Sequence, residues 1–194
     1  MAKKKYVFWI NLALVFALAV GMLLPTVNVR AADHAAKNKV LVVYFSATGT
    51  TESAAKKIKK AAGGRLYQIQ AEIPYTDADL DYSNDNCRAN REQRDESIRP
   101  KIKGTIKNIQ KYDVIFIGYP IWHGKEPMII RTFLESYNLK GKKIVPFCTS
   151  GGSGISGSIS GIKAAAKDAK VVKGKDLTDS SNKSVQKWVQ KKVK

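Results

Sequence analysis

The chain alternates between short apolar runs and longer amphipathic stretches from residue 39 onward. Three runs are nearly continuous in apolar residues, as strands buried on both faces are: Val40–Phe45, Asp113–Tyr119 and Lys143–Cys148. Apolar residues recur at helical spacing in three further places: about Thr50–Ala62, from Pro127 onward, and about Ser156–Asp168. Strands that alternate with helices in this way predict a parallel sheet covered on both faces and joined by right-handed crossovers.

Weaker patterns complete the order of elements. Gly63-Gly64 is expected to end the first helix. Arg65–Gln70 alternates like a strand, and Ala169–Lys173 predicts a short final strand. A last helix is expected around Trp188.

A long polar segment, residues 72–107, interrupts this alternation. Residues 86–96 within it could form a charged surface helix, and Tyr75 and Tyr82 could reach from it over a neighbouring site. A connection of this length inside a compact domain is usually functional or partly disordered. We therefore expect an extended loop or insertion here.

Three loops follow the carboxyl ends of predicted strands, where ligands collect in parallel sheets. The first, residues 46–51, leads from a strand into a helix and so places free N–H groups and a positive helix end together, as a phosphate site does. Its hydroxyl donors are Ser46, Thr48, Thr50 and Thr51, and its Gly49 allows close approach. Because the loop holds no lysine or arginine and no P-loop pattern, it suits one terminal monophosphate. The alternative is an ordinary turn with a threonine helix cap.

The second loop, residues 119–124, is aromatic. Trp122 and His123 follow a buried strand, and aromatic rings beside a cleft can stack on a flat heterocycle. The alternative is that Trp122 fills the core and His123 is merely exposed. His123 and Tyr75 are also weak candidates for a proton donor.

The third loop, residues 149–154, is rich in glycine. Gly152, Gly154 and Gly157 match a Gly-x-Gly-x-x-Gly pattern between a strand and a helix. A dinucleotide fingerprint also needs an acidic residue about 20 positions on, at the end of the next strand. Asp176 is the nearest candidate, and it follows only a short strand, so dinucleotide binding is disfavoured.

Together these motifs resemble the flavodoxin-like family, in particular its short bacterial members. The matching residues are Val-Val-Tyr-Phe-Ser46-x-Thr48-Gly49-x-Thr51, Tyr-Pro120-Ile-Trp122 and Phe-Cys148-Thr-Ser-Gly151-Gly152-Ser-Gly. The resemblance covers about residues 39–190. It implies a three-layer α/β/α sandwich, a five-stranded parallel sheet of order 2-1-3-4-5 and one non-covalent flavin mononucleotide (FMN).

The resemblance also implies three groups of FMN contacts. The phosphate would be held by Ser46, Thr48, Gly49, Thr50 and Thr51. The isoalloxazine ring would be flanked by Pro120, Ile121, Trp122 and His123. The polar edge of the ring would be lined by Ser150, Gly151, Gly152 and Gly154.

Two functions remain open from the sequence. The first is an electron carrier outside the cytoplasm that exchanges electrons with a partner protein or a small-molecule acceptor. The second is an FMN-dependent reductase of quinones or other small molecules, fed by NAD(P)H. An export signal disfavours the reductase, because NAD(P)H is scarce outside the cytoplasm.

The N-terminal residues predict export. Three lysines precede an apolar run at Tyr6–Leu24, and small residues follow it, which predicts a cleaved signal peptide or a membrane anchor in residues 1–31. Residues 32–38 would be a linker and 39–194 the flavodoxin-like domain. The protein would then be secreted or anchored outside the cytoplasm.

The composition sets further limits on partners. A net charge of +18 favours anionic surfaces, such as a cell-surface polymer or a membrane. The lysines are dispersed and accompany no nucleic-acid-binding motif, so nucleic acid is not expected. No metal site is expected, because metal-ligand spacings are lacking. The two cysteines, Cys87 and Cys148, could pair after export, but a bridge is disfavoured.

Overall fold

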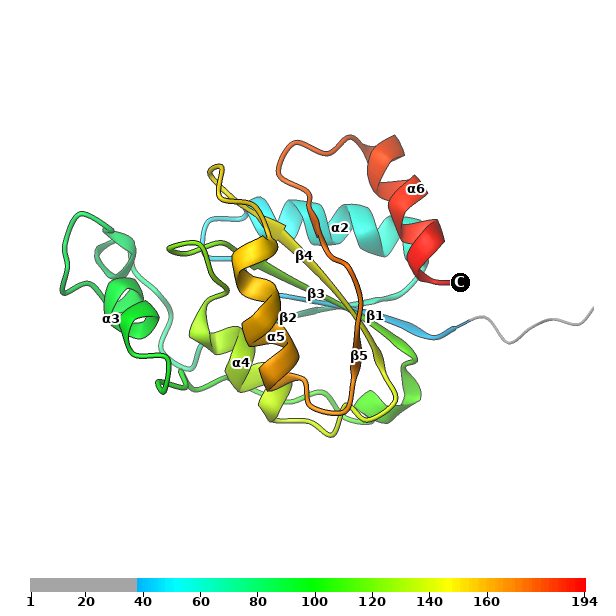
Figure 1. Ribbon diagram of the computed structural model, residues 1–194, viewed down its shortest axis with the longest axis horizontal. Coiled ribbons are helices and arrows are strands. Elements are labelled where there is room, and N and C mark those ends of the chain that lie inside the picture. Colours follow the sequence, from blue (N-terminus) through cyan, green and yellow to red (C-terminus); the bar gives the residue numbers. More distant parts are fainter. Residues whose placement is uncertain (1–37) are drawn as a thin grey trace, which may run out of the picture. The chain divides into compact units, whose positions relative to one another are not determined.

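The computed structural model describes residues 38–194 (Figure 1). The predicted signal peptide or anchor at 1–31, and the linker except for Asn38, lie outside these residues. Among the helices that are described, none has the length and apolar character that a membrane crossing requires.

The sheet is parallel throughout, with the order β2-β1-β3-β4-β5. Its strands are β1 (Val40–Tyr44), β2 (Arg65–Gln68), β3 (Val114–Pro120), β4 (Lys143–Thr149), β5 (Lys170–Val171) and β6 (Lys175–Asp176). The predicted α/β fold and strand order are therefore confirmed.

The outer strand position beside β4 is divided, which the sequence did not indicate. One strand was predicted at Ala169–Lys173, but β5 and β6 pair separately with the two ends of β4. The break lies beside Pro146 of β4, which has no N–H to donate. Gly174 lies so close that a Cβ on it would stand 2.7 Å from the carbonyl oxygen of Pro146.

Helices cover both faces of the sheet. On one face, α2 (Thr50–Ala62) and α6 (Asn182–Lys192) pack against alternate strand residues such as Val42 and Phe116. On the other face, α4 (Met128–Glu135) and α5 (Ile159–Ala165) pack against the residues between them, such as Val43. The alternation follows from the two-residue period of a strand. Short 3₁₀ turns occur at Ala78–Leu80 (η1), Ile109–Lys111 (η2) and Ser156–Ser158 (η3).

The segment 72–107 is ordered around a helix of its own. An antiparallel bridge between Ala71 and Ile102 closes its base. The charged helix predicted at 86–96 is shorter, α3 (Arg88–Arg94), and the Cys87 thiol caps it by accepting from the Asn90 N–H. Figure 1 shows this segment standing beside the sheet as a separate lobe. Cys87 and Cys148 are both buried and free, so they form no bridge.

Gly118 lets β3 and β4 meet in the centre of the sheet. Its register partner is Phe147, and a Cβ on Gly118 would lie 2.0 Å from the phenyl ring of Phe147. The ring therefore occupies the space that a side chain would need. No other residue type fits at this position without displacement of the ring.

We predict that Gly118→Ala lowers the free energy of unfolding by about 1–3 kcal/mol, the usual cost of overpacking a core. Urea denaturation measures the change. Gly151→Ala is the matched control, because a Cβ there meets nothing within 4 Å. Equal stability of the two variants would contradict the packing described for Phe147.

Candidate functional site

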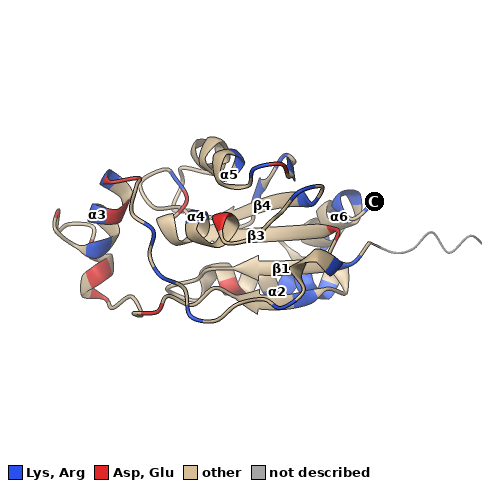
Figure 2. Cartoon of the chain, turned by 90° about the horizontal axis from the view of Figure 1, so that it is seen from below, with Lys and Arg blue, Asp and Glu red and all other residues tan. Residues whose placement is uncertain are grey.

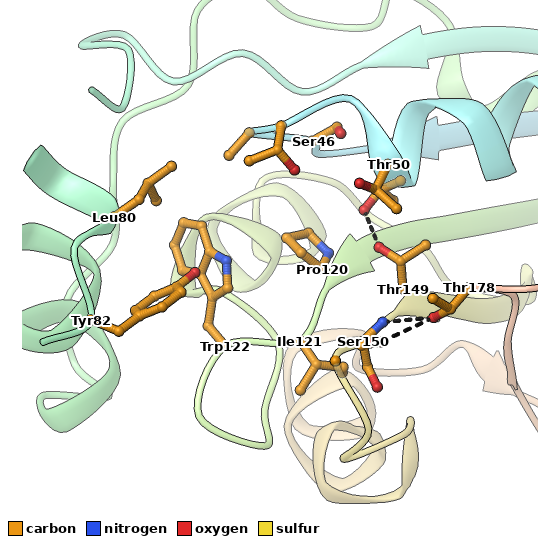
Figure 3. A pocket seen from close by; sticks show the side chains of 14 residues that line it. Ser46, Thr50, Leu80, Tyr82, Pro120, Ile121, Trp122, Thr149, Ser150 and Thr178 are labelled. Atoms are coloured by element: carbon orange, nitrogen blue, oxygen red, sulfur yellow. Dashed lines mark hydrogen bonds between the residues drawn. The ribbon is translucent and has the colours of Figure 1, made fainter. Parts of the chain in front are cut away.

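A cleft of about 390 Å³ opens at the carboxyl edge of the sheet (Figure 3). The three loops expected to meet there all contribute to it. The predicted residues that line it are Ser46, Thr48, Thr50, Thr51, Pro120, Ile121, Trp122, Ser150 and Gly151. The further lining residues are Ala47, Leu80, Tyr82, Thr149 and Thr178. The predicted residues outside the lining are Gly49, His123, Gly152 and Gly154.

The first loop leaves the start of α2 without a side-chain cap. Gly49 is the N-cap residue, with φ at 87°, and no side chain bonds to the first turn from this position. The threonine cap considered as an alternative is therefore absent. Ser46 Oγ instead accepts from the N–H of Gly49, 3.1 Å away. The following N–H groups of the first turn have no acceptor within the helix and stand beside the cleft.

Thr51 has a different position from the other hydroxyl residues of this loop. Its side chain is buried, and its Oγ1 lies 2.8 Å from Thr149 Oγ1 at the end of β4. This hydroxyl pair joins the first turn of α2 to the sheet, as Figure 3 shows. Thr50 and Thr48 are exposed, so their hydroxyl groups remain free to meet a ligand.

Two backbone N–H groups of the third loop donate hydrogen bonds within the loop itself. Ser150 Oγ accepts from the N–H groups of Gly152 and Gly154, at 3.0 and 2.9 Å. These two glycines therefore shape the loop. The Ser150 N–H donates to Thr178 Oγ1, and that hydroxyl donates to Asp176.

Thr178 and Thr149 are site residues that the motifs did not indicate. Thr149 was placed in the third loop but given no role. Thr178 follows β6, the strand segment that was not predicted. The sequence Leu-Thr-Asp-Ser-Ser after Asp176 is small and hydroxylated like the other three loops, and this was the available signal.

Trp122 forms the aromatic wall of the cleft and is also part of the core. It is only 3% exposed, and its ring packs edge-on against Phe45 and Tyr75, with ring centroids 5.6 and 5.2 Å away. The Tyr75 hydroxyl donates to Glu92 at 2.6 Å. Burial, together with the bond to Glu92, raises the pKa of Tyr75 far above its usual value. Tyr75 lies outside the cleft lining and supports Trp122 from behind.

His123 lies in a tight turn between β3 and α4. Trp122 and Lys125 exchange two backbone hydrogen bonds of 3.0 Å, and both residues between them have positive φ, 47° for His123 and 77° for Gly124. This is the conformation of a type I′ turn. His123 Nε2 lies 2.5 Å from Asn90 Oδ1, so the ring is held by α3.

The segment 72–107 and the aromatic turn are tied together in two further ways. Gln93 Nε2 donates to the carbonyl oxygens of Trp122 and Glu126, at 2.7 and 3.2 Å. Tyr82 packs edge-on against the His123 ring. As a result Tyr82 and Leu80 stand over the cleft, as Figure 3 shows, and Tyr82 reaches it as the sequence suggested.

The opposite side of the turn rests on two glycines. A Cβ on Gly157 would lie 2.3 Å from the Gly124 carbonyl oxygen, and one on Gly161 would lie 1.8 Å from Glu126 Oε1. The Glu126 side chain is buried there and accepts from Arg131 Nε at 2.7 Å. Burial raises the pKa of its carboxyl group. The turn is therefore gripped from both sides and holds Trp122 in place.

Across residues 38–194 no cluster of histidine, cysteine and acidic side chains is arranged to hold a metal ion. The cleft itself is lined by hydroxyl, aliphatic and aromatic groups, with no charged side chain among them. Such a lining suits a ligand that has one polar tail and one flat apolar body.

Comparison with known proteins identifies relatives. The family model described as Flavodoxin matches residues 39–192. No curated protein matches the chain. A provisionally assigned flavoprotein from Bacteroides eggerthii is 46% identical, with a TM-score of 0.77, and the match covers 81% of this chain and 99% of that one.

Two further solved structures are similar. A provisionally assigned flavoprotein from Bacteroides uniformis is 40% identical, with a TM-score of 0.76 over 79% of this chain and 98% of its own. A flavoprotein from Lactobacillus acidophilus, solved in complex with FMN, is 24% identical, with a TM-score of 0.60 over 81% of this chain and 99% of its own. At this lower identity the likeness shows the fold.

We predict that Thr51→Val destabilises the fold by about 1–3 kcal/mol, because it leaves the Thr149 hydroxyl buried without its partner. Urea unfolding measures the change. The double variant Thr51→Val with Thr149→Val should recover part of the loss, because it leaves neither hydroxyl unpaired. Thr48→Val, at an exposed position, is the control. A fully additive double variant would show that the two hydroxyl groups do not interact.

Proposed function

The chain belongs to the flavodoxin family, and on that basis we propose that it binds one FMN non-covalently and carries electrons outside the cytoplasm. The observation that carries this proposal is the uncapped start of α2, which opens into a cleft with an aromatic wall. The volume of about 390 Å³ lies within the range of small-molecule sites.

The residues of the first loop fit a terminal phosphate. Thr48 and Thr50 line the cleft beside the uncapped N–H groups of the first turn of α2, which are donors that suit a phosphate. The acidic residue in this turn, Glu52, pairs with Lys56 at 2.6 Å. Thr51 contributes by holding the turn against β4 rather than by its own hydroxyl.

The other lining residues fit a flat ring. Trp122 and Tyr82 would stand beside it, and the 120–121 and 150–151 segments would line its edges. Bound FMN supplies the redox chemistry. The protein fixes the orientation of the ring through the rigid turn that carries Trp122, and it excludes water through Leu80 and Tyr82.

The two candidate proton donors favour the carrier over the reductase. The Tyr75 hydroxyl is committed to Glu92, and the His123 ring to Asn90. Neither residue lines the cleft. A reductase that drew its proton from Tyr75 or His123 would need that residue to be free and to face the cleft.

The location outside the cytoplasm rests on the sequence of residues 1–31, with its basic start and its apolar run at Tyr6–Leu24. Export would also explain why the donor should be another redox protein rather than NAD(P)H.

We predict that the purified protein binds FMN at one site, observed by quenching of the FMN fluorescence during titration. Thr48→Ala combined with Thr50→Ala should weaken FMN binding by roughly tenfold or more, because two hydroxyl donors to the phosphate are lost. The same variant should bind riboflavin, which has no phosphate, as the wild type does. A protein that stays without FMN in a large excess of the cofactor would overturn the proposed function.

We also predict that NADPH reduces the FMN-loaded protein slowly, whereas a chemical reductant such as dithionite reduces it at once. Anaerobic mixing followed by absorbance near 450 nm, roughly where oxidised flavins absorb, measures both rates. Rapid turnover with NADPH and a quinone would favour the reductase instead.

A further inference from the structure

Positive charge is concentrated at the end of the domain opposite the cleft. Three of the parallel strands have a lysine at their amino ends: Lys39 directly before β1, and Lys143 and Lys170 as the first residues of β4 and β5. Parallel strands place these lysines along one edge. By contrast, no lysine or arginine lines the cleft at the carboxyl edge.

The helices end at the same edge, and they also end in lysine. Basic residues occupy the last turns of α2 (Lys59 and Lys60), α5 (Lys163) and α6 (Lys191 and Lys192). Hydrogen bonds from Lys143 Nζ to the carbonyl oxygens of residues 192 and 194 place the end of α6 beside the start of β4. Lysine at a helix C-terminus is favourable for the helix dipole, which accounts for part of this pattern.

Further lysines lie outside the α-helices at the same edge. Lys111 precedes β3, Lys140 precedes β4 and Lys167 precedes β5, and all three are exposed. We call residues 39, 59–60, 107–113, 138–143, 163–170 and 191–194 the basic end. Figure 2 shows blue segments of the chain at this end, near α6 and the end of α2, whereas blue and red segments are mixed around α3.

The few acidic residues nearby do not cancel this charge. Asp113 Oδ2 accepts from the backbone N–H of Lys39 at 2.8 Å. Glu135, in the last turn of α4, is paired with Arg99 at 2.7 Å. Asp168 is the remaining carboxylate of the basic end. The lysines therefore outnumber the carboxylates, and the basic end carries a net positive charge.

The N-terminal part of the chain joins the domain at the basic end. Asn38 donates through its side-chain amide to the carbonyl oxygen of Val193, 2.8 Å away, beside the end of α6. Thirteen residues separate it from Leu24, the end of the apolar run. Thirteen residues reach at most about 45 Å, so a membrane that held the apolar run would lie within that distance of the point where the chain enters the basic end.

We propose that the basic end is a docking surface for an anionic phospholipid membrane, which turns the cleft away from the bilayer toward soluble partners. Charge complementarity supplies the attraction, and the point where the chain enters the domain favours lipid over a free polymer. The proposal rests on the fold and on the charges, and it does not depend on FMN binding.

The test uses residues 38–194, which form one compact unit with a buried core of its own. This domain should sediment with phosphatidylcholine vesicles that contain phosphatidylglycerol, and not with pure phosphatidylcholine. Binding should be lost at roughly 0.5 M salt, where surface charges are screened. Equal binding to both vesicles, or to neither, would overturn the proposal.

Matched variants then locate the surface. Removing four charges from the basic end, by changing Lys111, Lys140, Lys167 and Lys170 to Gln, should weaken vesicle binding by roughly tenfold or more. Removing four exposed charges elsewhere should weaken it much less; the control changes Lys56, Lys101, Lys173 and Lys183 to Gln. Equal losses in the two variants would show that only net charge acts, and would overturn the docking surface. Because all four positions of each set are exposed, circular dichroism should show both variants folded.

Dyes attached at two positions would report which end of the domain faces the membrane. Both native cysteines are buried, so an environment-sensitive dye can be attached to Lys140→Cys at the basic end or to Asp85→Cys on the 72–107 segment. On anionic vesicles the dye at position 140 should shift its emission, and the dye at position 85 should not. A shift at position 85 alone would place the cleft end on the membrane and overturn the proposal. A soluble anionic polymer that binds while vesicles do not would overturn it as well.

Discussion

The parallel pairing of β1, β3 and β4 determines where the three main loops of the cleft lie. Because all strands run the same way, the loops that follow them meet at one edge of the sheet. Ser46 of the first loop and Pro120 of the second are more than 70 residues apart in the chain, yet both line the cleft. The buried Thr51–Thr149 hydroxyl pair then fixes the start of α2 against this edge. The uncapped first turn is useful only because it is held at that position.

The aromatic turn shows how a site gains rigidity from elements that do not touch a ligand. Gly157 and Gly161 let the turn approach one helix, and Asn90 and Gln93 hold it from the opposite side. The positive φ of His123 is an uncommon conformation for a residue other than glycine, and it is maintained by these contacts. The consequence is a Trp122 ring with little freedom to move before a cofactor arrives.

The net charge suggests a specific surface only once the positions of the lysines on the fold are known. The sequence suggested lysines dispersed along the chain, which favours a general attraction to anionic surfaces. In the structure the strand starts and the helix ends bring many of them to one edge, opposite an uncharged cleft. The charge of the domain is therefore distributed unevenly: the cleft at one end has no charged lining residue, and the basic end opposite it carries many lysines.

The sequence pattern by itself determined the α/β fold and the three loops of the cleft, and the resemblance to a known family supplied the strand order. Continuous apolar runs and helical spacing are local signals, and the hydroxyl-rich turn at 46–51 is one as well. Only the tertiary structure decided which members of each loop face a ligand. Thr51 turned inward to Thr149, Gly152 and Gly154 bonded to Ser150, and Thr178 entered from a strand segment too short to predict. The partners of Thr51 and Thr178 are distant in sequence, so no local pattern of residues indicates these contacts.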